Sequence, residues 1–369
     1  MAIHLKEFDV DSFRGIKDLK ISNMNHINIV AGDNNCGKTS ILEALLLLRN
    51  PGEPSNLIRI ARLRKKGPGG SGERTYQSFM NLFHHERAEE AFERRLGIKA
   101  CFSDSELHCE VFGYEKLTML DLEAMGDNPS IRYGKPEIPQ ECLEFQGKQI
   151  CKYGGMLSKK EFTFNEFDMV SKFPISNQRL LNVVYLAPFD HLDRSIFSNI
   201  ISSAAYKDLC IKVLQEFDPD IQDILLTRDK FSSWPIECVE HRELGIMPIS
   251  TYGDGIKKVL SIANGLASAR GGILLIDEIE TALHAKYYES IFSFIMLASR
   301  KFEVQVFITT HSLEAIDSFL AIEEYDDQKE YDSLSVITLK KERNRSYSRV
   351  LSGRHVYENR EKFGFEVRL

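Results

Sequence analysis

The octapeptide Gly-Asp-Asn-Asn-Cys-Gly-Lys-Thr, residues 32–39, constrains the fold of this chain more than any other stretch. It follows an alternating, strand-like pattern from His26 to Ala31 and precedes an apolar, helix-like pattern from Ser40 to Leu48. The order strand, Gly-x-x-x-x-Gly-Lys-Thr, helix identifies a phosphate-binding loop. Its glycines let the backbone wrap the phosphates, while successive N–H groups and the start of the helix point at the anion.

This loop also predicts roles for individual residues. Lys38 is expected to reach the β- and γ-phosphates, and the Thr39 hydroxyl is expected to ligate Mg²⁺. The other nucleotide-binding residues predicted in and after the loop are Asn34, Asn35, Cys36, Gly37 and Ser40.

A second motif supplies carboxylates. A continuous apolar run from Ile273 to Ile276 ends in Asp277 and Glu278. Such a run is typical of a strand buried on both faces of a parallel sheet, and side chains at its carboxyl end lie where α/β sheets bind ligands. We expect Asp277 to hold the metal and Glu278 to take a proton from a water that attacks the γ-phosphate. The alternative is an acidic start to a helix from Ile279 to Ala298.

A third apolar, β-branched run, residues 303–308, leads into Thr309, Thr310, His311 and Ser312. A histidine at the end of a strand that faces phosphate can sense or stabilise the γ-phosphate. With the other two motifs present, we assign His311 this catalytic role, against the alternative of a structural histidine.

A second glycine-rich turn, Ser250-Thr-Tyr-Gly253-Asp254-Gly255, opens another helix-like run. Turns of this kind commonly hold an anion at the start of a helix. The alternative is a plain turn that caps the helix. Lys257 and Lys258 follow; a solvent-exposed helix face is favoured for both over contact with phosphate.

With these motifs in this order, the chain resembles the ABC-class ATPases. Within that class it is similar to the overcoming-lysogenization-defect (OLD-like) type and its AAA-labelled relatives, which are related to SMC and RecF heads. The resemblance covers residues 1–50 and about 245–369, and the middle by position only. It is carried by FRGIKDLKI (13–21), the Walker A stretch GDNNCGKTS (32–40), the signature STYGDGIKK (250–258), Walker B with the D-loop LLIDEIETALH (274–284), the switch-histidine stretch TTHSLE (309–314) and the closing GFEVRL (364–369).

The resemblance implies an α/β fold, a P-loop NTPase of ABC-ATPase type. Its mixed central sheet would have flanking helices and an inserted antiparallel β/α arm. Residues 1–97 would form the N-terminal part of the head, 98–182 the β-rich arm and 183–369 the C-terminal part. Within this scheme, residues 86–97 are predicted to be a charged helix with a stop at Gly97, and Val183 to Pro188 returns to the central sheet.

In this class a nucleotide lies between two protomers, which implies an Mg²⁺-dependent ATPase that forms a head-to-tail homodimer or a higher homo-oligomer. One copy lends its P-loop and the other its signature. Asp254 departs from the class-wide Ser-Gly-Gly pattern; the OLD-like branch commonly has such an acid, and it could contact the partner or a lysine. The residues predicted to act across the interface are Ser250, Gly253, Asp254 and Gly255.

Two further candidates come from the resemblance alone. Arg14 lies in the N-terminal strand–turn, where the family often contacts the base or α-phosphate, although a solvent-facing arginine is the alternative. Gln77 is the nearest candidate for the glutamine that supports the metal ion in the Q-loop.

The implied function is an ATP-driven switch. Full-length OLD-type nucleases carry a C-terminal Toprim domain, for which about 60 residues past His311 are too few. The acidic run at 323–332 is interpreted as a solvated loop. We therefore expect a separate effector, nuclease- or Toprim-like, in bacterial anti-phage defence or a toxin–antitoxin pair. The alternative is a RecF- or SMC-like DNA-repair or recombination ATPase; a transporter subunit fits the signature less well.

The composition of the chain argues against several classes of ligand and cellular location. Against 47 basic residues stand 54 acidic ones, a net charge of −7, which argues against general attraction to nucleic acid or membranes. Nucleic acid remains a candidate ligand of the basic stretch 59–66, which is equally well a solvated loop. No run approaches the roughly 20 apolar residues of a membrane span. Seven scattered cysteines without a Cys-x-x-Cys pair are typical of reduced thiols in a cytoplasm.

Overall fold

The computed structural model describes most of the chain. The described ranges are 4–66, 74–84, 93–119, 141–168, 172–173, 179–192, 198–228, 235–325, 333–343, 345–364 and 366–367. Residues 67–72 form a Gly/Pro/Ser-rich stretch whose composition predicts a flexible loop. This stretch and residues 326–332 of the acidic run lie outside the described ranges.

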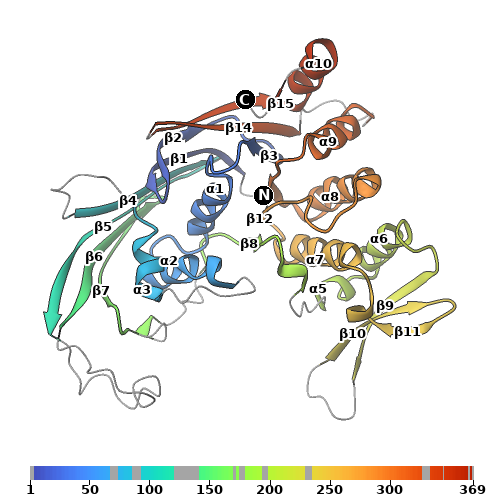
Figure 1. The fold of residues 1–369 in the computed structure, drawn as a ribbon, viewed down its shortest axis with the longest axis horizontal. Helices are drawn as coiled ribbons and strands as arrows, with labels where there is room; N and C mark the ends of the chain where they lie inside the picture. The colour runs from blue at the N-terminus through green and yellow to red at the C-terminus, as the bar shows by residue number, and fades with distance from the viewer. Residues whose placement is uncertain are drawn as a thin grey trace.

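A six-stranded mixed sheet forms the centre of the fold (Figure 1). Five of its strands are parallel, and the last is antiparallel to its neighbour. Because parallel strands end at the same side, the residues after them line one carboxyl edge of the sheet. In spatial order the strands are β8 (Val183–Leu186), β12 (Ile273–Ile276), β13 (Gln305–Thr309), β3 (Ile27–Gly32), β14 (Leu334–Glu342) and β15 (Arg345–Ser352).

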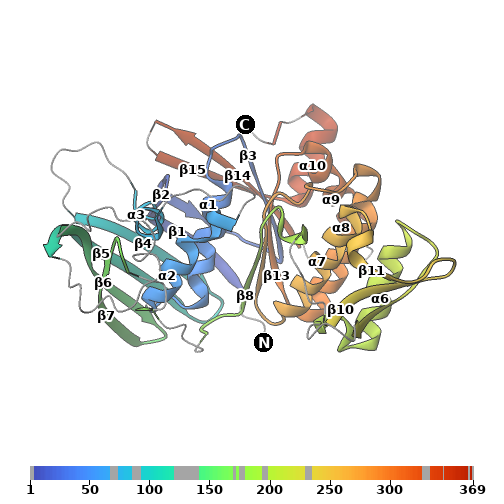
Figure 2. The same ribbon diagram turned by 60° about the horizontal axis from the view of Figure 1, so that its bottom comes forward.

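Alternate residues of the central strands pack into two different cores. Val30 and Leu275 belong to the core shared with the antiparallel sheet, whereas Ile29 and Leu274 pack under the C-terminal helices. Figure 2 shows these two layers on opposite sides of the central sheet. The helices of the second layer are α5 (Ser198–Ile201), α6 (Ala204–Gln215), α7 (Asp254–Ser268), α8 (Tyr288–Phe302), α9 (Leu313–Tyr325) and α10 (Gly353–Phe363).

A six-stranded antiparallel sheet makes up the other side of the molecule. Its order is β2 (Ile16–Ile21), β1 (Leu5–Phe13), β4 (Glu93–Phe102), β5 (Glu106–Met119), β6 (Glu141–Tyr153) and β7 (Met156–Asn165). Between the two large sheets lie α1 (Lys38–Leu45), η1 (Leu46–Arg49), α2 (Pro54–Ala61) and α3 (Thr75–Met80) (Figures 1 and 2).

The helix predicted from residue 86 to Gly97 is wrong where it is described, because residues 93–97 begin β4. Leu96 and Ile98 face the core, while Arg95 points to the surface, so burial follows the two-residue period of a strand. Strands β4 to β7 therefore extend the sheet of β1 and β2. The boundary predicted between residues 97 and 98 falls inside β4.

A small three-stranded sheet precedes the second glycine-rich turn. It contains β9 (Ile221–Arg228), β10 (Pro235–His241) and β11 (Gly245–Pro248). The sequence pattern predicts helix on both sides of a break at Asp218-Pro219. The prediction is wrong for the residues of β9, since the chain changes from helix to strand around Pro219. From β11 the chain runs through η5 (Ile249–Thr251) directly into α7.

Candidate active site

The phosphate-binding loop joins β3 to α1 in a conformation that needs its glycines. Gly32 and Gly37 have φ angles of 142° and 106°. A Cβ atom on Gly32 would lie 2.5 Å from the backbone oxygen of Leu339 and 2.8 Å from Cys36 Sγ. No side chain caps the start of α1 in the described structure. The first N–H groups of this helix are therefore placed to meet an anion.

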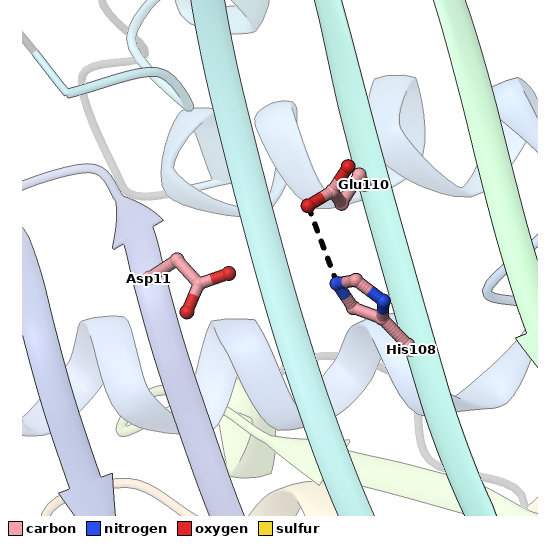
Figure 3. Close-up of side chains that lie close together, drawn as sticks. All are labelled: Asp11, His108 and Glu110. Atoms are coloured by element: carbon pink, nitrogen blue, oxygen red, sulfur yellow. Dashed lines mark ion pairs between the residues drawn. The ribbon is translucent and has the colours of Figure 1, made fainter.

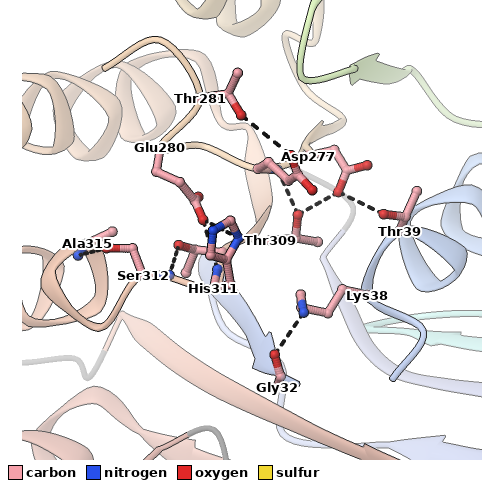
Figure 4. Close-up of polar contacts among 12 residues, drawn as sticks. Gly32, Lys38, Thr39, Asp277, Glu280, Thr281, Thr309, His311, Ser312 and Ala315 are labelled. Carbon is pink, nitrogen blue, oxygen red and sulfur yellow. Dashed lines mark hydrogen bonds and ion pairs between the residues drawn. The ribbon is translucent and has the colours of Figure 1, made fainter. Parts of the chain in front are cut away.

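Lys38 folds back across the loop that precedes it. Its Nζ donates a hydrogen bond to the backbone oxygen of Gly32 at 2.8 Å (Figure 4) and another to that of Asp33 at 2.8 Å. The ammonium is thus held over the mouth of the loop. Cys36, in contrast, is buried beneath the loop, where burial raises the pKa of its thiol, and it does not line the cavity described below.

Asp277 occupies the carboxyl end of β12 and is 3% exposed. Its Oδ1 accepts from Thr39 Oγ1 at 3.2 Å and from Thr309 Oγ1 at 2.6 Å (Figure 4), and its Oδ2 accepts from the Tyr185 hydroxyl at 3.0 Å. Burial and then the neighbouring Asp277 raise the pKa of Tyr185, so this hydroxyl stays a donor. Thr39 and Asp277 together offer the hard oxygen ligands that Mg²⁺ prefers, and this donor set fits the metal expected from the sequence.

Glu278 follows Asp277 with a left-handed backbone, φ 47°, and lines the cavity. Its N–H donates to Thr309 Oγ1 at 2.8 Å, which holds the unusual conformation. Left-handed geometry at a glutamate costs about 1 kcal/mol or more and is concentrated at functional sites. The alternative of a helix starting at Ile279 is wrong: a turn and η6 (Ala285–Tyr287) intervene before α8.

His311 is held by a carboxylate at the same edge. Its Nδ1 lies 2.8 Å from Glu280 Oε1, and its backbone N–H donates to the same oxygen at 2.9 Å (Figure 4). The side chain is 57% exposed and lies at the cavity. Glu280 therefore fixes the orientation of the ring, a role that the sequence analysis did not assign to it.

These groups line a single cavity of about 700 Å³, a size typical of ligand sites. The structure thus brings together the predicted phosphate loop, the carboxylates and the histidine. The described lining residues are Asn34, Asn35, Gly37, Lys38, Thr39, Ser40, Glu43, Leu63, Arg64, Tyr185, Ala187, Pro188, Phe189, Asp190, Leu192, Asp277, Glu278 and His311.

Arg14 is not among the lining residues. Its guanidinium is buried against Glu43, with Nε 2.7 Å from Oε2. Arg64 contacts the same carboxylate from the side of the cavity. Its Nε donates to Oε1 at 2.8 Å and its Nη2 donates to Oε2 at 2.7 Å, and Nη2 also donates to Ser40 Oγ at 3.1 Å. The arginine that reaches the cavity is therefore Arg64, from the basic stretch interpreted as a loop or a nucleic-acid contact.

Gln77 is exposed on α3 and is not brought to the cavity. Asp190, which follows β8, lines the cavity instead. Its Oδ2 accepts from the Ala187 N–H at 2.8 Å. Because β8 lies beside β12 in the central sheet, its end meets the carboxyl edge at Asp277. The sequence held no local signal for this placement.

The glycine-rich turn, residues 250–255 and here called the signature turn, lies elsewhere. Ser250, Gly253 and Asp254 are exposed, Gly255 is half-buried, and none of them is among the described residues that line the cavity. Asp254 accepts from Lys257 Nζ at 3.1 Å. The expectation of an exposed Lys258 is wrong, because this side chain is 2% exposed.

A second group of titratable side chains lies on the surface of the antiparallel sheet (Figure 3). Ligand atoms of Asp11, His108 and Glu110 lie within 4.8 Å of one another. Asp11 leans into the space left by Gly97, where a Cβ atom would lie 2.8 Å from Asp11 Oδ2. Glu110 already pairs with Arg95 at 2.8 Å and with His108 at 3.3 Å. In the described structure Glu110 therefore already has two partners, Arg95 and His108.

Two family models match the chain. The one described as "AAA ATPase domain" matches residues 4–186. The one described as "AAA domain, putative AbiEii toxin, Type IV TA system" matches residues 174–317. Together they span both the phosphate-binding loop and the carboxylates of β12.

Three known proteins are similar over most of their length. An "ATP/GTP phosphatase" of Helicobacter pylori is 23% identical over 327 residues, 84% of this chain and 85% of that protein. "Uncharacterized protein MJECL10" of Methanocaldococcus jannaschii is 42% identical over 235 residues, 63% of this chain and 93% of that protein. "Septu protein PtuA" of Bacillus thuringiensis is 20% identical over 331 residues, 84% of this chain and 72% of that protein.

Among solved structures, "Crystal structure of the SmcHead bound to the C-winged helix domain of ScpA" matches with a TM-score of 0.51. The identity is 13%, and the match covers 96% of this chain and 99% of that one, so the likeness is one of fold. It agrees with the ABC-type head expected from the motifs. Residues 4–186 and 174–317 therefore resemble AAA ATPase domains, and the chain is a P-loop ATPase with the α/β fold of an SMC-like ABC head.

Proposed function

We propose that this ATPase is an Mg²⁺-dependent switch: two copies close head to tail around ATP, hydrolysis opens them, and the cycle controls a separate effector protein. The observation that carries the proposal is the place of the signature turn. Ser250 and Gly253 are exposed, and no residue of the turn is among the described residues lining the cavity of its own chain. The turn is therefore available to the nucleotide of a second copy.

The chemistry of the turn fits a phosphate. It leads into the 15-residue helix α7, whose first N–H groups receive no side-chain cap in the described structure. A Cβ atom added to Gly253 would meet no described atom within 4 Å, so the turn presents bare backbone. The start of a helix attracts anions. The pairing of Asp254 with Lys257 offsets the negative charge within the turn.

Within one chain the cavity residues divide the work. Lys38 would contact the β- and γ-phosphates, while Thr39 and Asp277 would hold Mg²⁺. The bound metal supplies electrostatic stabilisation of the phosphate charge. Glu278 would accept a proton from the attacking water, and His311, oriented by Glu280, would meet the γ-phosphate. Arg64, beside Ser40, adds a cation on the far side of the loop.

The effector is proposed to be a nuclease- or Toprim-like protein in bacterial anti-phage defence. The family description for residues 174–317 names a putative toxin and a type IV toxin–antitoxin system. One relative is a Septu protein, and the SmcHead structure is, by its title, bound to a domain of ScpA. These names support a partner of separate sequence. The OLD-like branch, higher homo-oligomers and a cytoplasmic setting are parts of the same proposal.

Subunit complementation tests the shared site. Lys38→Ala removes the phosphate contact in one chain, and Gly253→Glu blocks the signature turn of the other where no described neighbour crowds the change. Each variant alone should hydrolyse ATP at least tenfold more slowly. An equal mixture should recover about a quarter of the wild-type rate, because half the dimers are mixed and each has one intact site of two. A mixture with no recovery would contradict the proposal.

Glu278→Gln tests the catalytic assignment in the same dimer. The amide cannot take the proton, so turnover should fall at least about 100-fold. ATP binding should persist, and the ATP-bound dimer should survive dilution on size-exclusion chromatography. A lone subunit that cleaves ATP at full rate at any concentration would exclude the shared site.

A second candidate is a RecF- or SMC-like ATPase that acts on DNA directly, and the fold likeness to the SmcHead favours it. It predicts hydrolysis that DNA stimulates and that salt suppresses. ATPase rates with and without duplex DNA at two ionic strengths separate the two candidates.

A further inference from the structure

Lys258 is a buried cation between α7 and the wall of the nucleotide cavity. It lies one turn after the signature turn and is 2% exposed, whereas the side chain of its neighbour Lys257 is 21% exposed and pairs with Asp254. The Nζ of Lys258 donates to the backbone oxygen of Pro188 at 3.3 Å. Pro188 itself lines the cavity.

The segment that receives this contact is a compact turn, residues 187–192, here called the cavity-wall loop. The Asp190 carboxylate accepts from the Ala187 N–H at 2.8 Å, which closes the turn. His191, which is 6% exposed, places Nδ1 3.0 Å from the same Pro188 oxygen that Lys258 contacts. One side of the loop therefore faces the nucleotide cavity, and the other side packs against α7, where Lys258 contacts the Pro188 carbonyl.

Electrostatics ties Lys258 to the catalytic groups as well. A buried ammonium is costly unless opposite charges compensate. Burial lowers the pKa of Lys258 to about 8, although the negative charges of four carboxylates act in the other direction and raise it. Burial and then Lys258 itself lower the pKa of the adjacent His191. The four carboxylates come from the cavity-wall loop and from the carboxyl edge at the end of β12, namely Asp190, Asp277, Glu278 and Glu280.

We propose that Lys258 is a positioning residue that couples occupation of the cavity to the placement of the signature turn on the same chain. A nucleotide in the cavity contacts Phe189 and Asp190 on one side of the loop, and the loop bears on Lys258 through Pro188. Because α7 is a continuous helix, a shift of Lys258 moves the turn at its start. A chain would then offer its signature to a second copy when its own cavity is filled.

This inference rests on the proposed role of the signature turn across a dimer interface. As a coupling between two sites it must be reciprocal. Engagement of the signature turn by a partner therefore tightens nucleotide in the cavity of the same chain.

Hydrogen–deuterium exchange on dilute, single subunits tests the coupling without a dimer. The probe is the non-hydrolysable ATP analogue AMP-PNP with Mg²⁺, and the variant is Lys258→Met. Lys301→Met, at an exposed lysine of α8, is the matched control. The analogue should slow exchange in residues 187–192 of all three proteins. It should slow exchange in residues 250–258 of the wild type and the control, but not of Lys258→Met.

Kinetics supply a second readout that a merely structural role would not give. Lys258→Met should lower kcat at least tenfold while KM for ATP changes less than threefold. In the Glu278→Gln background it should raise the dissociation constant of the ATP-bound dimer at least tenfold. Lys258→Leu, which also lacks a donor for Pro188, replaces the methionine variant if thermal unfolding shows that the latter is not folded.

Three results would overturn the coupling: wild-type exchange in residues 250–258 that ignores the analogue, wild-type kcat in Lys258→Met, or loss of nucleotide binding as complete as in Lys38→Ala. The last would make Lys258 part of the binding site. If the exchange result appears as expected but no variant or wild type dimerises, the proposed dimer fails and the coupling stands.

Discussion

Thr309, at the end of β13, donates a 2.6 Å hydrogen bond to Asp277, at the end of β12. The same hydroxyl accepts from the backbone N–H of Glu278 at 2.8 Å. One side chain thus fixes both the expected metal ligand and the left-handed backbone of the expected base. The parallel pairing of Ile276 with Ile308 places the two strand ends side by side and so sets this geometry.

Replacing Thr309 by valine should therefore impair turnover more than folding. Valine keeps the branched shape but removes the hydroxyl, so Asp277 loses a donor and Glu278 loses its acceptor. We expect kcat to fall about 10- to 100-fold, the range typical of groups that orient metal ligands. Thr309→Ser retains the hydroxyl and should keep most activity. Equal steady-state rates for the valine and serine variants would contradict this role.

Glu43 is the common partner of Arg14 and Arg64 and is 1% exposed. Glu43→Gln leaves the Arg14 guanidinium buried without a full opposite charge, so the free energy of unfolding should fall by about 3 kcal/mol. Urea denaturation measures this change. The matched control is Glu161→Gln, which removes an exposed partner of Lys148 and should leave stability unchanged.

Gly272 precedes β12 where the chain passes close to Asn182. An added Cβ atom would lie 2.0 Å from the backbone oxygen of Asn182, which cannot rotate away. Gly272→Ala should lower the free energy of unfolding by about 3 kcal/mol, at the upper end of overpacking costs. Gly253→Ala, with no described atom within 4 Å, should fold like the wild type. Similar melting temperatures for both variants would refute the close approach.

The partly buried His26 should lower the free energy of unfolding in mild acid. Burial, then His4 and Arg300, lower its pKa from 6.5 to about 4. Between these values the unfolded chain binds more protons than the folded one, so stability falls as the pH drops from 6.5 to 4 and is unaffected by this group at higher pH. The loss at pH 4 should be about 3 kcal/mol. His26→Gln should lack this component when urea unfolding is compared at pH 7 and pH 4.

The sequence predicted the phosphate-binding loop and the buried strands of a parallel sheet because the relevant signals are local, whereas the mixed central sheet was implied by the resemblance to ABC-class ATPases. A glycine-rich loop between a strand and a helix, and apolar runs that end in acids or histidine, each occupy about ten residues. Since parallel strands end at the same edge of the sheet, these local signals are enough to predict that Lys38, Asp277 and His311 lie close together. The helix predicted before Gly97 failed because its charged residues have high helix propensity, while pairing with β1 and β5 decides the strand.

Contacts between distant segments were not predictable in this way. Arg64 reaches the cavity because it packs on Glu43, and Asp190 does so because β8 lies beside β12. Lys258 is buried by a loop about 70 residues earlier in the chain. In each case the sequence shows an ordinary charged residue, and only the tertiary arrangement gives it a neighbour.

The alternation of β3, β12 and β13 between two cores has a consequence for cooperativity. Each of these strands is a shared wall, so neither half of the molecule can melt while the other keeps its packing. The nucleotide site lies at the ends of the same strands, so it is lost when either half unfolds. Heating should therefore abolish ligand affinity and both halves in one transition, and a bound triphosphate would delay the melting of parts that it never touches.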